Sequence, residues 1–307
     1  MHARRILAAA GIAASAVVLA ACASANPLSP GDGDTSTAGG RIVVGSAAFP
    51  EAEILAYIYA DGLKAAGFDV DVKPSIGARD AYIGALEDGS IDVVPEYTGN
   101  LLQYFDANAT AQSPDDVLAA LKTAVPSGFE VLDPAEAQDA DSYNVTKAFS
   151  EQYGVTSLAD LVKVTVPLSV GANPEFADRP YGIPGLKSVY GVDATLVPIN
   201  DGGGPNTLAA LLDGTVQLAD IYSTTPSIAE NDLVTLDDPE HMILAQNVIP
   251  LIASAAASDE VVSTLNAIQA KLTTEDLIAM NERSSGDEKA SSQTIADDWL
   301  AQHGFAG

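Results

Sequence analysis

The chain has 307 residues and a formal net charge of −28, because 42 Asp and Glu outnumber 14 Lys and Arg. This balance argues against nucleic acid as a partner, whose phosphates need Lys and Arg, and against adhesion to anionic lipid surfaces. A hydrophobic content of 47% excludes a globally disordered chain, and the length is enough for two lobes of ordinary domain size. A single cysteine excludes an internal disulfide.

The first 22 residues predict export. Arg4 and Arg5 precede an apolar stretch without acidic residues, which ends at Leu19-Ala20-Ala21-Cys22. This pattern is typical of a secretory signal, and the apolar run is shorter than the roughly 20 residues that span a bilayer. The end of the stretch resembles the lipobox of bacterial lipoproteins. The resemblance implies that the signal, residues 1–21, is cleaved and that a lipid on Cys22 anchors the chain to the cell membrane outside the cytoplasm. A plain secretory signal with an incidental cysteine is the alternative.

The first part of the chain after the signal alternates between predicted strands and helices. Residues 22–40 are small, polar and turn-forming, which predicts a flexible tether before the fold begins at Arg41. Short apolar or alternating runs predict strands, and apolar residues at helical spacing predict helices. The strands are expected at residues 42–45, 68–72 and 91–94, and the helices at residues 53–66, 80–87, 98–105 and 114–125. The alternation predicts an α/β fold with a parallel-rich sheet.

The pattern restarts after Tyr143 and indicates a second α/β lobe. Strands are expected at residues 163–171, 194–199 and 217–222, and helices at residues 205–212, 259–272, 274–282 and 295–303. Residues 247–253 are mostly apolar and interrupted by proline. The run Asp201–Gly204 is compatible with a tight turn, or with backbone N–H groups that bind an anion at a helix start.

Few residues of this chain are suited to catalysis. His241 and His303 stand alone, and neither a nucleophile elbow nor a phosphate-binding glycine loop occurs. We therefore expect no enzyme activity, no cofactor and no metal site.

Five segments resemble the substrate-binding lipoproteins of ABC importers for quaternary-ammonium osmoprotectants, namely glycine betaine, choline, carnitine and proline betaine. The segments are Val43–Glu51, Ile91–Asn100, Glu175–Leu186, Asp220–Thr224 and Gln246–Leu251. The most specific are Pro-Glu-Tyr-Thr-Gly, which ends at Gly99, and the Glu175–Leu186 block.

The resemblance implies a type II periplasmic-binding fold, in which two chain segments cross between two lobes and the ligand lies in the cleft. It places residues 41–143 and 247–307 in lobe 1 and residues 144–246 in lobe 2. It also implies an ABC permease as partner. We expect a monomer that binds a small molecule. The ligand contacts it implies are Phe49, Tyr97, Asn100, Tyr143, Arg179, Tyr222 and Gln246.

These residue types suit a quaternary ammonium. Such a cation donates no hydrogen bond, and the face of an aromatic ring attracts its diffuse charge by about 0.5–2 kcal/mol. In the resemblance, Tyr97, Tyr143 and Tyr222 match aromatic positions of the cage, and Arg179 matches the residue that holds the ligand's carboxylate. Asn100 stands among the polar groups at that end.

Three positions depart from the family pattern; Thr225 stands where an aspartate is common, and the other two are ligand contacts. Ala47 replaces a lysine, and Gln246 replaces the fourth aromatic of the cage. We therefore expect weaker binding of glycine betaine than is typical of the family. Two alternatives stay open: the same fold with a neutral, hydroxyl-rich or aromatic ligand, and an envelope lipoprotein that senses and does not transport.

Overall fold

Two five-stranded sheets organise the chain. The computed structural model describes residues 40–305, which belong to one compact unit. The predicted signal, Cys22 and all of the predicted tether except Gly40 lie outside the described residues. No helix within the described part of the chain is both long enough and apolar enough to cross a membrane.

The first sheet has the strand order β2-β1-β3-β10-β4. Its strands are β1 (Ile42–Ala47), β2 (Val70–Gly77), β3 (Val93–Tyr97), β4 (Phe129–Val131) and β10 (Val248–Ala253). Strand β1 pairs in parallel with β2 and β3, whereas β10 runs antiparallel to β3 and β4. The sheet is therefore parallel-rich, with one antiparallel strand contributed from far along the chain.

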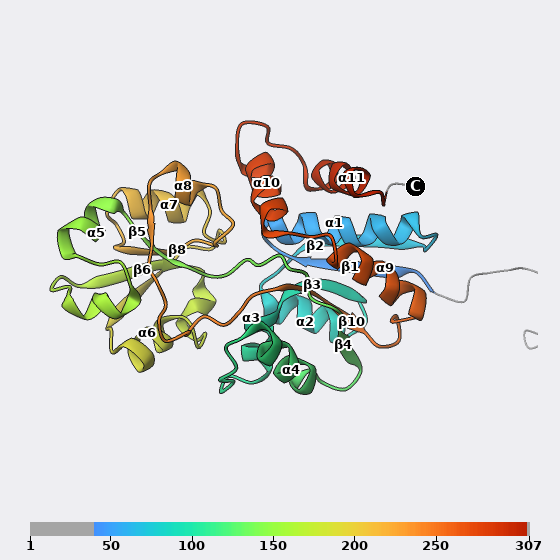
Figure 1. Ribbon diagram of the computed structural model, residues 1–307, viewed down its shortest axis with the longest axis horizontal. Helices are drawn as coiled ribbons and strands as arrows, with labels where there is room; N and C mark the ends of the chain where they lie inside the picture. Colours follow the sequence, from blue (N-terminus) through green and yellow to red (C-terminus); the bar gives the residue numbers. More distant parts are fainter. Residues whose placement is uncertain (1–39, 306–307) are drawn as a thin grey trace, which may run out of the picture. The chain divides into compact units, whose positions relative to one another are not determined.

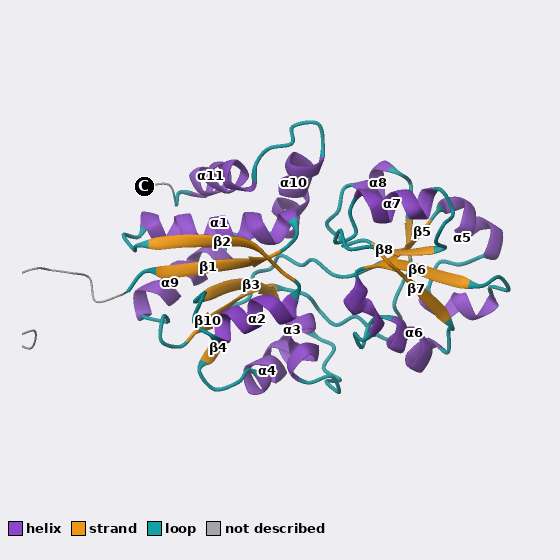
Figure 2. Ribbon diagram, turned by 180° about the vertical axis from the view of Figure 1, so that it is seen from behind, coloured by secondary structure: helices purple, strands orange, loops and turns teal. Residues whose placement is uncertain are grey.

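Helices cover both faces of the first sheet (Figures 1 and 2). One face carries α1 (Pro50–Ala65), α9 (Asp259–Gln269), α10 (Thr274–Ser285) and α11 (Ser292–His303). The opposite face carries α2 (Arg79–Glu87), α3 (Thr98–Phe105) and α4 (Pro114–Ala124). The C-terminal helices therefore share the hydrophobic core of this face, because they pack on α1.

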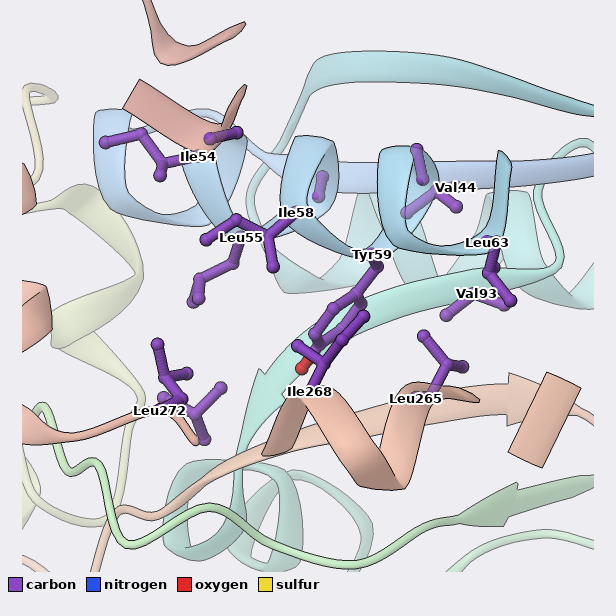
Figure 3. Close-up of a cluster of buried hydrophobic side chains, with 14 of the residues drawn as sticks. Val44, Ile54, Leu55, Ile58, Tyr59, Leu63, Val93, Leu265, Ile268 and Leu272 are labelled. Atoms are coloured by element: carbon purple, nitrogen blue, oxygen red, sulfur yellow. The ribbon is translucent and has the colours of Figure 1, made fainter. Parts of the chain in front are cut away.

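Helix α1 supplies much of the first core. It begins with Pro50, whose missing N–H costs nothing at a helix start, and its apolar residues recur at helical spacing. Figure 3 shows Ile54, Ile58 and Tyr59 of this helix among the buried side chains that also include Leu265 and Ile268 of α9. The Tyr59 hydroxyl donates to Gln269 Oε1 at 3.0 Å, so burial leaves it no unpaired donor.

The second sheet has the order β7-β6-β8-β5-β9. Its strands are β5 (Tyr143–Val145), β6 (Leu168–Ala172), β7 (Ala194–Pro198), β8 (Leu218–Asp220) and β9 (Val234–Thr235). The helices of this lobe are α5 (Lys147–Tyr153), α6 (Ile183–Tyr190), α7 (Pro205–Leu212), α8 (Ser227–Glu230) and the 3-10 helices η1 (Leu158–Lys163) and η2 (Pro174–Ala177). Strand β6 is parallel to β7 and β8, and β5 is antiparallel to β8 and β9.

The two sheets share one plan. In each, three parallel strands are followed by an antiparallel strand that adjoins a crossing segment, β10 in the first sheet and β5 in the second. The crossing segments, residues 132–142 and 236–247, pair with each other: the Asp139 N–H donates to the Gln246 carbonyl at 3.1 Å. This is the two-lobed fold with two crossing segments that the sequence predicts.

Every helix and strand predicted from the sequence has a counterpart in the structure. The bounds of α3 and α7 are as predicted, and those of the other elements are shifted. The predicted strand at 163–171 begins only at Leu168, because Ser157 and Asp160 form a capping box that starts η1 before it. The proline-interrupted segment 247–253 is β10, where Pro250 pairs with Pro95 of β3. Because neither proline has an N–H, no donor is left unmatched there. The strands β4, β5 and β9, the helices α5, α6 and α8, and the 3-10 helices η1 and η2 were not predicted.

The division into lobes at 143/144 and 246/247 stays a prediction. The first sheet draws its strands from residues 42–131 and 248–253, and the second from residues 143–235.

Candidate functional site

A cavity of about 230 Å³ lies where the two sheets face each other. Its walls include residues at or just after the carboxyl ends of six strands. These strands are β1, β2 and β3 in the first sheet and β6, β7 and β8 in the second. Open α/β sheets bind ligands at this end of their strands, because the loops there are free to carry polar and aromatic side chains. The part of the crossing segment from Asp139 to Asp141 completes the wall.

Three aromatic rings gather on one side of the cavity. Phe49, which follows β1, stacks on Tyr97 at the end of β3, with ring centroids 6.3 Å apart and an interplanar angle of 29°. The Tyr222 ring, which follows β8, meets Phe49 edge-on at 5.4 Å. Gly202 packs against Phe49 and Tyr222, since a Cβ at this position would lie 3.4 Å from Phe49 Cβ. The cluster therefore joins rings from both sheets.

The hydroxyl of Tyr97 is tied into a buried polar network. It donates to Glu51 Oε1 at 2.6 Å. The other oxygen of Glu51 accepts from Thr224 Oγ1 at 2.7 Å and from Asn281 Nδ2 at 2.6 Å. Burial, and then the charge of Glu51, raises the pKa of Tyr97 well above its usual range, so this hydroxyl stays a donor. The network fixes the Tyr97 ring and connects α1 to the loop after Tyr222.

Three buried carboxyl groups line the same cavity: Asp139, Asp141 and Asp220. Burial raises the pKa of Asp139, and the nearby Glu51 raises it further, although N–H and O–H donors from Ser223 and Thr224 oppose the shift. Burial raises the pKa of Asp220, and the adjacent Asp141 charge adds to that. The pKa of Asp141 is also raised by burial, against the hydrogen bond from Asn100. The cavity is thus acidic as well as aromatic.

Two arginines line the cavity, and they have different partners. The guanidinium of Arg79 makes a bidentate pair with Glu96, with Nε–Oε1 at 2.8 Å and Nη2–Oε2 at 3.0 Å. Arg179 has a looser partner: its Nη2 lies 3.7 Å from Asp80 Oδ2. Arg179 is therefore the cation with more freedom to meet an anionic ligand group.

Gln246 positions Asn100. Its Oε1 accepts from the Asn100 backbone N–H at 3.0 Å, and its Nε2 donates to Asn100 Oδ1 at 2.6 Å. Asn100 Nδ2 in turn donates to Asp141 Oδ2 at 2.6 Å. This chain of amides joins the return crossing segment to the acidic wall.

The structure brings five of the seven predicted ligand contacts to the cavity wall: Phe49, Tyr97, Asn100, Arg179 and Tyr222. Tyr143 and Gln246 are not part of this wall. The Tyr143 hydroxyl donates to the Tyr181 carbonyl at 2.8 Å, and its ring packs 5.6 Å from Phe176, so it lies one layer behind the surface. Ala47, where the family pattern has lysine, does line the cavity. Ligand contact by each of these residues stays a prediction.

The glycine run after β7 is a capped turn. The Asp201 carboxylate accepts from the backbone N–H groups of Gly204 at 3.1 Å, Asn206 at 2.7 Å and Thr207 at 3.2 Å. At the start of α7, these backbone N–H groups therefore bind the Asp201 carboxylate of the protein itself.

The carboxyl groups and Arg79 were missed by sequence reasoning. A signal existed for Asp139 and Asp141, because alternate residues of an extended segment face the same way and this segment crosses the cleft. No comparable signal marks Asp220 or the pairing of Arg79 with Glu96.

Gly99 allows α3 to approach the return crossing segment. A Cβ at this position would lie 2.7 Å from the Ala245 carbonyl oxygen and 2.8 Å from Gln246 Nε2. We expect Gly99→Ala to lower the free energy of unfolding by about 1–3 kcal/mol through overpacking. Gly84→Ala is the matched control, because a Cβ in the middle of α2 meets nothing within 4 Å. Urea unfolding of both variants measures the difference, and equal stability would contradict the close approach.

Among the described residues, no group of three or more His, Cys, Asp or Glu side chains is arranged to hold a metal ion. The cavity instead combines aromatic faces, buried carboxyl groups and an arginine, a set that binds a small polar or charged molecule.

Two lobes of this topology around such a cavity define a periplasmic-type solute-binding protein. A family model described as "Substrate binding domain of ABC-type glycine betaine transport system" matches residues 40–302. The chain therefore belongs to this family.

Three similar proteins illustrate the relationship. "Glycine betaine-binding protein YehZ" of Escherichia coli (strain K12) is 27% identical over 287 residues, which cover 86% of this chain and 91% of the relative. "Glycine-betaine-binding protein" of Pseudomonas aeruginosa is 26% identical over 274 residues, with 85% and 87% covered. A solved structure titled "Crystal structure of glycine betaine/carnitine/choline ABC transporter" is 20% identical, with a TM-score of 0.68 and coverage of 87% of this chain and all of that one.

Family membership establishes the kind of work that the chain does. It is the substrate-binding protein of an ABC importer. Such a protein acts outside the cytoplasm, where it binds a small ligand and delivers it to the permease. The family consists of transport proteins and not of enzymes. The alternatives of an unrelated neutral ligand or a purely sensing lipoprotein are not favoured by these relatives.

Proposed function

We propose that this protein captures a small methylated-ammonium solute of the betaine or choline type in the cavity between its lobes and delivers it to an ABC permease. The observation that carries the proposal is the cluster of Phe49, Tyr97 and Tyr222 rings beside buried carboxyl groups. Two relatives are named as glycine betaine-binding proteins, which supports the same ligand class.

The chemistry of the cavity suits such a cation. Each ring contact contributes about 0.5–2 kcal/mol, and more when water is excluded. Tyr97 is 7% exposed, and Phe49 and Tyr222 are half-buried, so the aromatic side of the cavity is partly shielded from water. Three rings supply a few kcal/mol of the −8.2 kcal/mol that corresponds to a dissociation constant of about 1 μM. Contact area and the carboxyl groups supply the rest.

Where the ligand carries a carboxylate, Arg179 is the group that we propose to receive it. Its partner Asp80 is 3.7 Å away and has a largely exposed side chain, so this ion pair is weak and exchanges at little cost. Arg79 is already matched by Glu96 and is left out of this role.

Isothermal titration calorimetry of the purified protein tests the proposal. Titrations with glycine betaine, choline, carnitine and proline betaine are compared with titrations of neutral polyols. We expect binding of at least one methylated ammonium in the micromolar range and no binding of the polyols. Failure of every methylated ammonium to bind would refute the proposed ligand class.

We also propose that the chain acts as a monomer tethered through a lipid on Cys22. The basic start, apolar stretch and cysteine at positions 1–22 support the anchor.

The anchor is tested by Cys22→Ser. Because the thioether lipid forms on the cysteine sulfur, we expect the substitution to release the protein from membranes or to leave its signal uncleaved. Membrane fractionation and intact-mass measurement distinguish these results from wild type. If both forms are soluble and have the masses expected for identical cleavage without lipid, the anchor does not exist.

A further inference from the structure

Asp220 is the most unusual polar group of the cavity. Its side chain is 2% exposed and lines the cavity at the end of β8. Its Oδ1 is buried, and among the described residues no amide, hydroxyl or guanidinium group donates a hydrogen bond to it. A buried acceptor without a partner is unfavourable, and native proteins keep few of them, so such a group calls for an explanation.

No basic side chain of the described residues pairs with Asp220. None of the ion pairs formed within residues 40–305 includes Asp220 or its neighbour Asp141. Arg79 is engaged by Glu96, and Asn100 Nδ2 donates to Asp141. The two adjacent carboxyl groups therefore form no ion pair. Burial raises the pKa of Asp220, and the charge of Asp141 and a hydrogen bond between the two carboxyl groups raise it further.

A bound cation would compensate the charge of the carboxyl groups. The acceptor Oδ1 also needs a hydrogen-bond donor, which charge alone does not provide. A fully methylated ammonium offers only C–H groups and leaves Asp220 Oδ1 without a conventional donor. An ammonium that retains an N–H, or one with a nearby hydroxyl, makes a charge-assisted hydrogen bond, which is about twice as strong as a neutral one. A site with a buried polar group discriminates most strongly against a ligand that lacks its partner.

We infer that Asp220 is a specificity-determining residue, which makes this protein prefer methylated ammonium ligands with an N–H or O–H donor over their fully capped analogues. The inference rests on the proposed function, because it assumes that the aromatic cluster holds the cation. Asp220 adds selection within that ligand class. The neighbouring Asp141 carboxyl disfavours a ligand carboxylate at the same end of the cavity, so a carboxylate-bearing ligand must turn that group toward Arg179.

Two matched ligand pairs test the inference in wild-type protein. Trimethylammonium, which stays protonated at neutral pH, differs from tetramethylammonium by one N–H in place of a methyl group. Choline differs from propyltrimethylammonium by a hydroxyl in place of a methyl group. Calorimetry should show that the donor-bearing member binds at least tenfold more tightly in at least one pair, about 1.4 kcal/mol. Equal affinities, or tighter binding of the capped members in both pairs, would overturn the inference.

Asp220→Asn assigns the preference to this side chain. It keeps the shape and removes the charge, so we expect the tenfold preference to disappear while the capped ligands still bind. Glu175→Gln is the matched control, because it neutralises another carboxylate that lines the cavity, and we expect it to keep the preference. Circular dichroism and thermal melts confirm that both variants fold. A preference that survives Asp220→Asn, or that Glu175→Gln abolishes equally, would overturn the role of Asp220.

The same titrations separate the two proposals. If the ligands bind but the two members of each pair bind equally, the proposed function stands and the role of Asp220 falls. If no ammonium ligand binds, both fall together.

Discussion

Replacement of Tyr222 by Ala is expected to weaken binding of a methylated ammonium by about tenfold or more, or about 1.4 kcal/mol. The substitution removes one ring of the cage and also the edge contact that holds Phe49 at 5.4 Å. Tyr222→Phe should bind almost as tightly as wild type, because the face of the ring attracts the cation. The hydroxyl has only a long contact, 3.5 Å, with Asn173 Nδ2.

Tyr153→Ala is the control for this experiment. Tyr153 also belongs to the second lobe and packs on Phe149, with ring centroids 4.7 Å apart, but it does not line the cavity. Calorimetry with the wild-type ligand should leave the affinity of Tyr153→Ala unchanged. An affinity of Tyr222→Ala equal to that of the control would remove Tyr222 from the site.

Glu51→Ala should cause a large loss of stability. The Glu51 side chain is 3% exposed and accepts hydrogen bonds from Tyr97, Thr224 and Asn281 at 2.6–2.7 Å. Each buried donor left without an acceptor costs about 1–3 kcal/mol, so we expect the free energy of unfolding to fall by about 3 kcal/mol or more. Relief of the repulsion between Glu51 and Asp139 offsets a part of this loss.

Glu53→Ala, in the same helix, is the matched control. Glu53 accepts one long hydrogen bond, 3.3 Å, from Ser292 and is half-buried. Urea unfolding should show a much smaller loss for this variant. If the two variants lose the same stability, the hydrogen bonds to Glu51 do not contribute to stability as proposed.

The sequence predicted the fold well because the fold depends on local patterns. The apolar spacing in α1 and the alternation of strands and helices up to α4 were visible in the chain. The short strands β4, β5 and β9 were not, since two or three residues carry no detectable period. Their place in a sheet is decided by pairing with distant strands.

The candidate site was predicted in part. The resemblance carried by the Pro-Glu-Tyr-Thr-Gly motif predicted Tyr97 and Asn100 as ligand contacts. In the structure Tyr97 ends β3, Asn100 lies in the first turn of α3, and both line the cavity. The match at Tyr143 identified a residue that the structure places behind Phe176 and Tyr181, because a motif gives a position and not the direction of a side chain.

The polar networks were beyond the reach of sequence patterns. Glu51 and Asn281 are 230 positions apart, and Gln246 and Asn100 are 146 apart, so no periodicity links them. Only the folded chain brings their side chains together. These contacts decide the orientation of the Tyr97 ring and of the Asn100 amide in the cavity.

A crystal structure of the protein with a bound methylated ammonium, such as choline, tests the central claim most directly. The account predicts electron density for the cation in the cavity between the sheets. Its nitrogen should lie within about 6 Å of the ring centroids of Phe49, Tyr97 and Tyr222, the range of a cation–π contact. A ligand bound elsewhere, or in the cavity with its cation away from all three rings, would contradict the account.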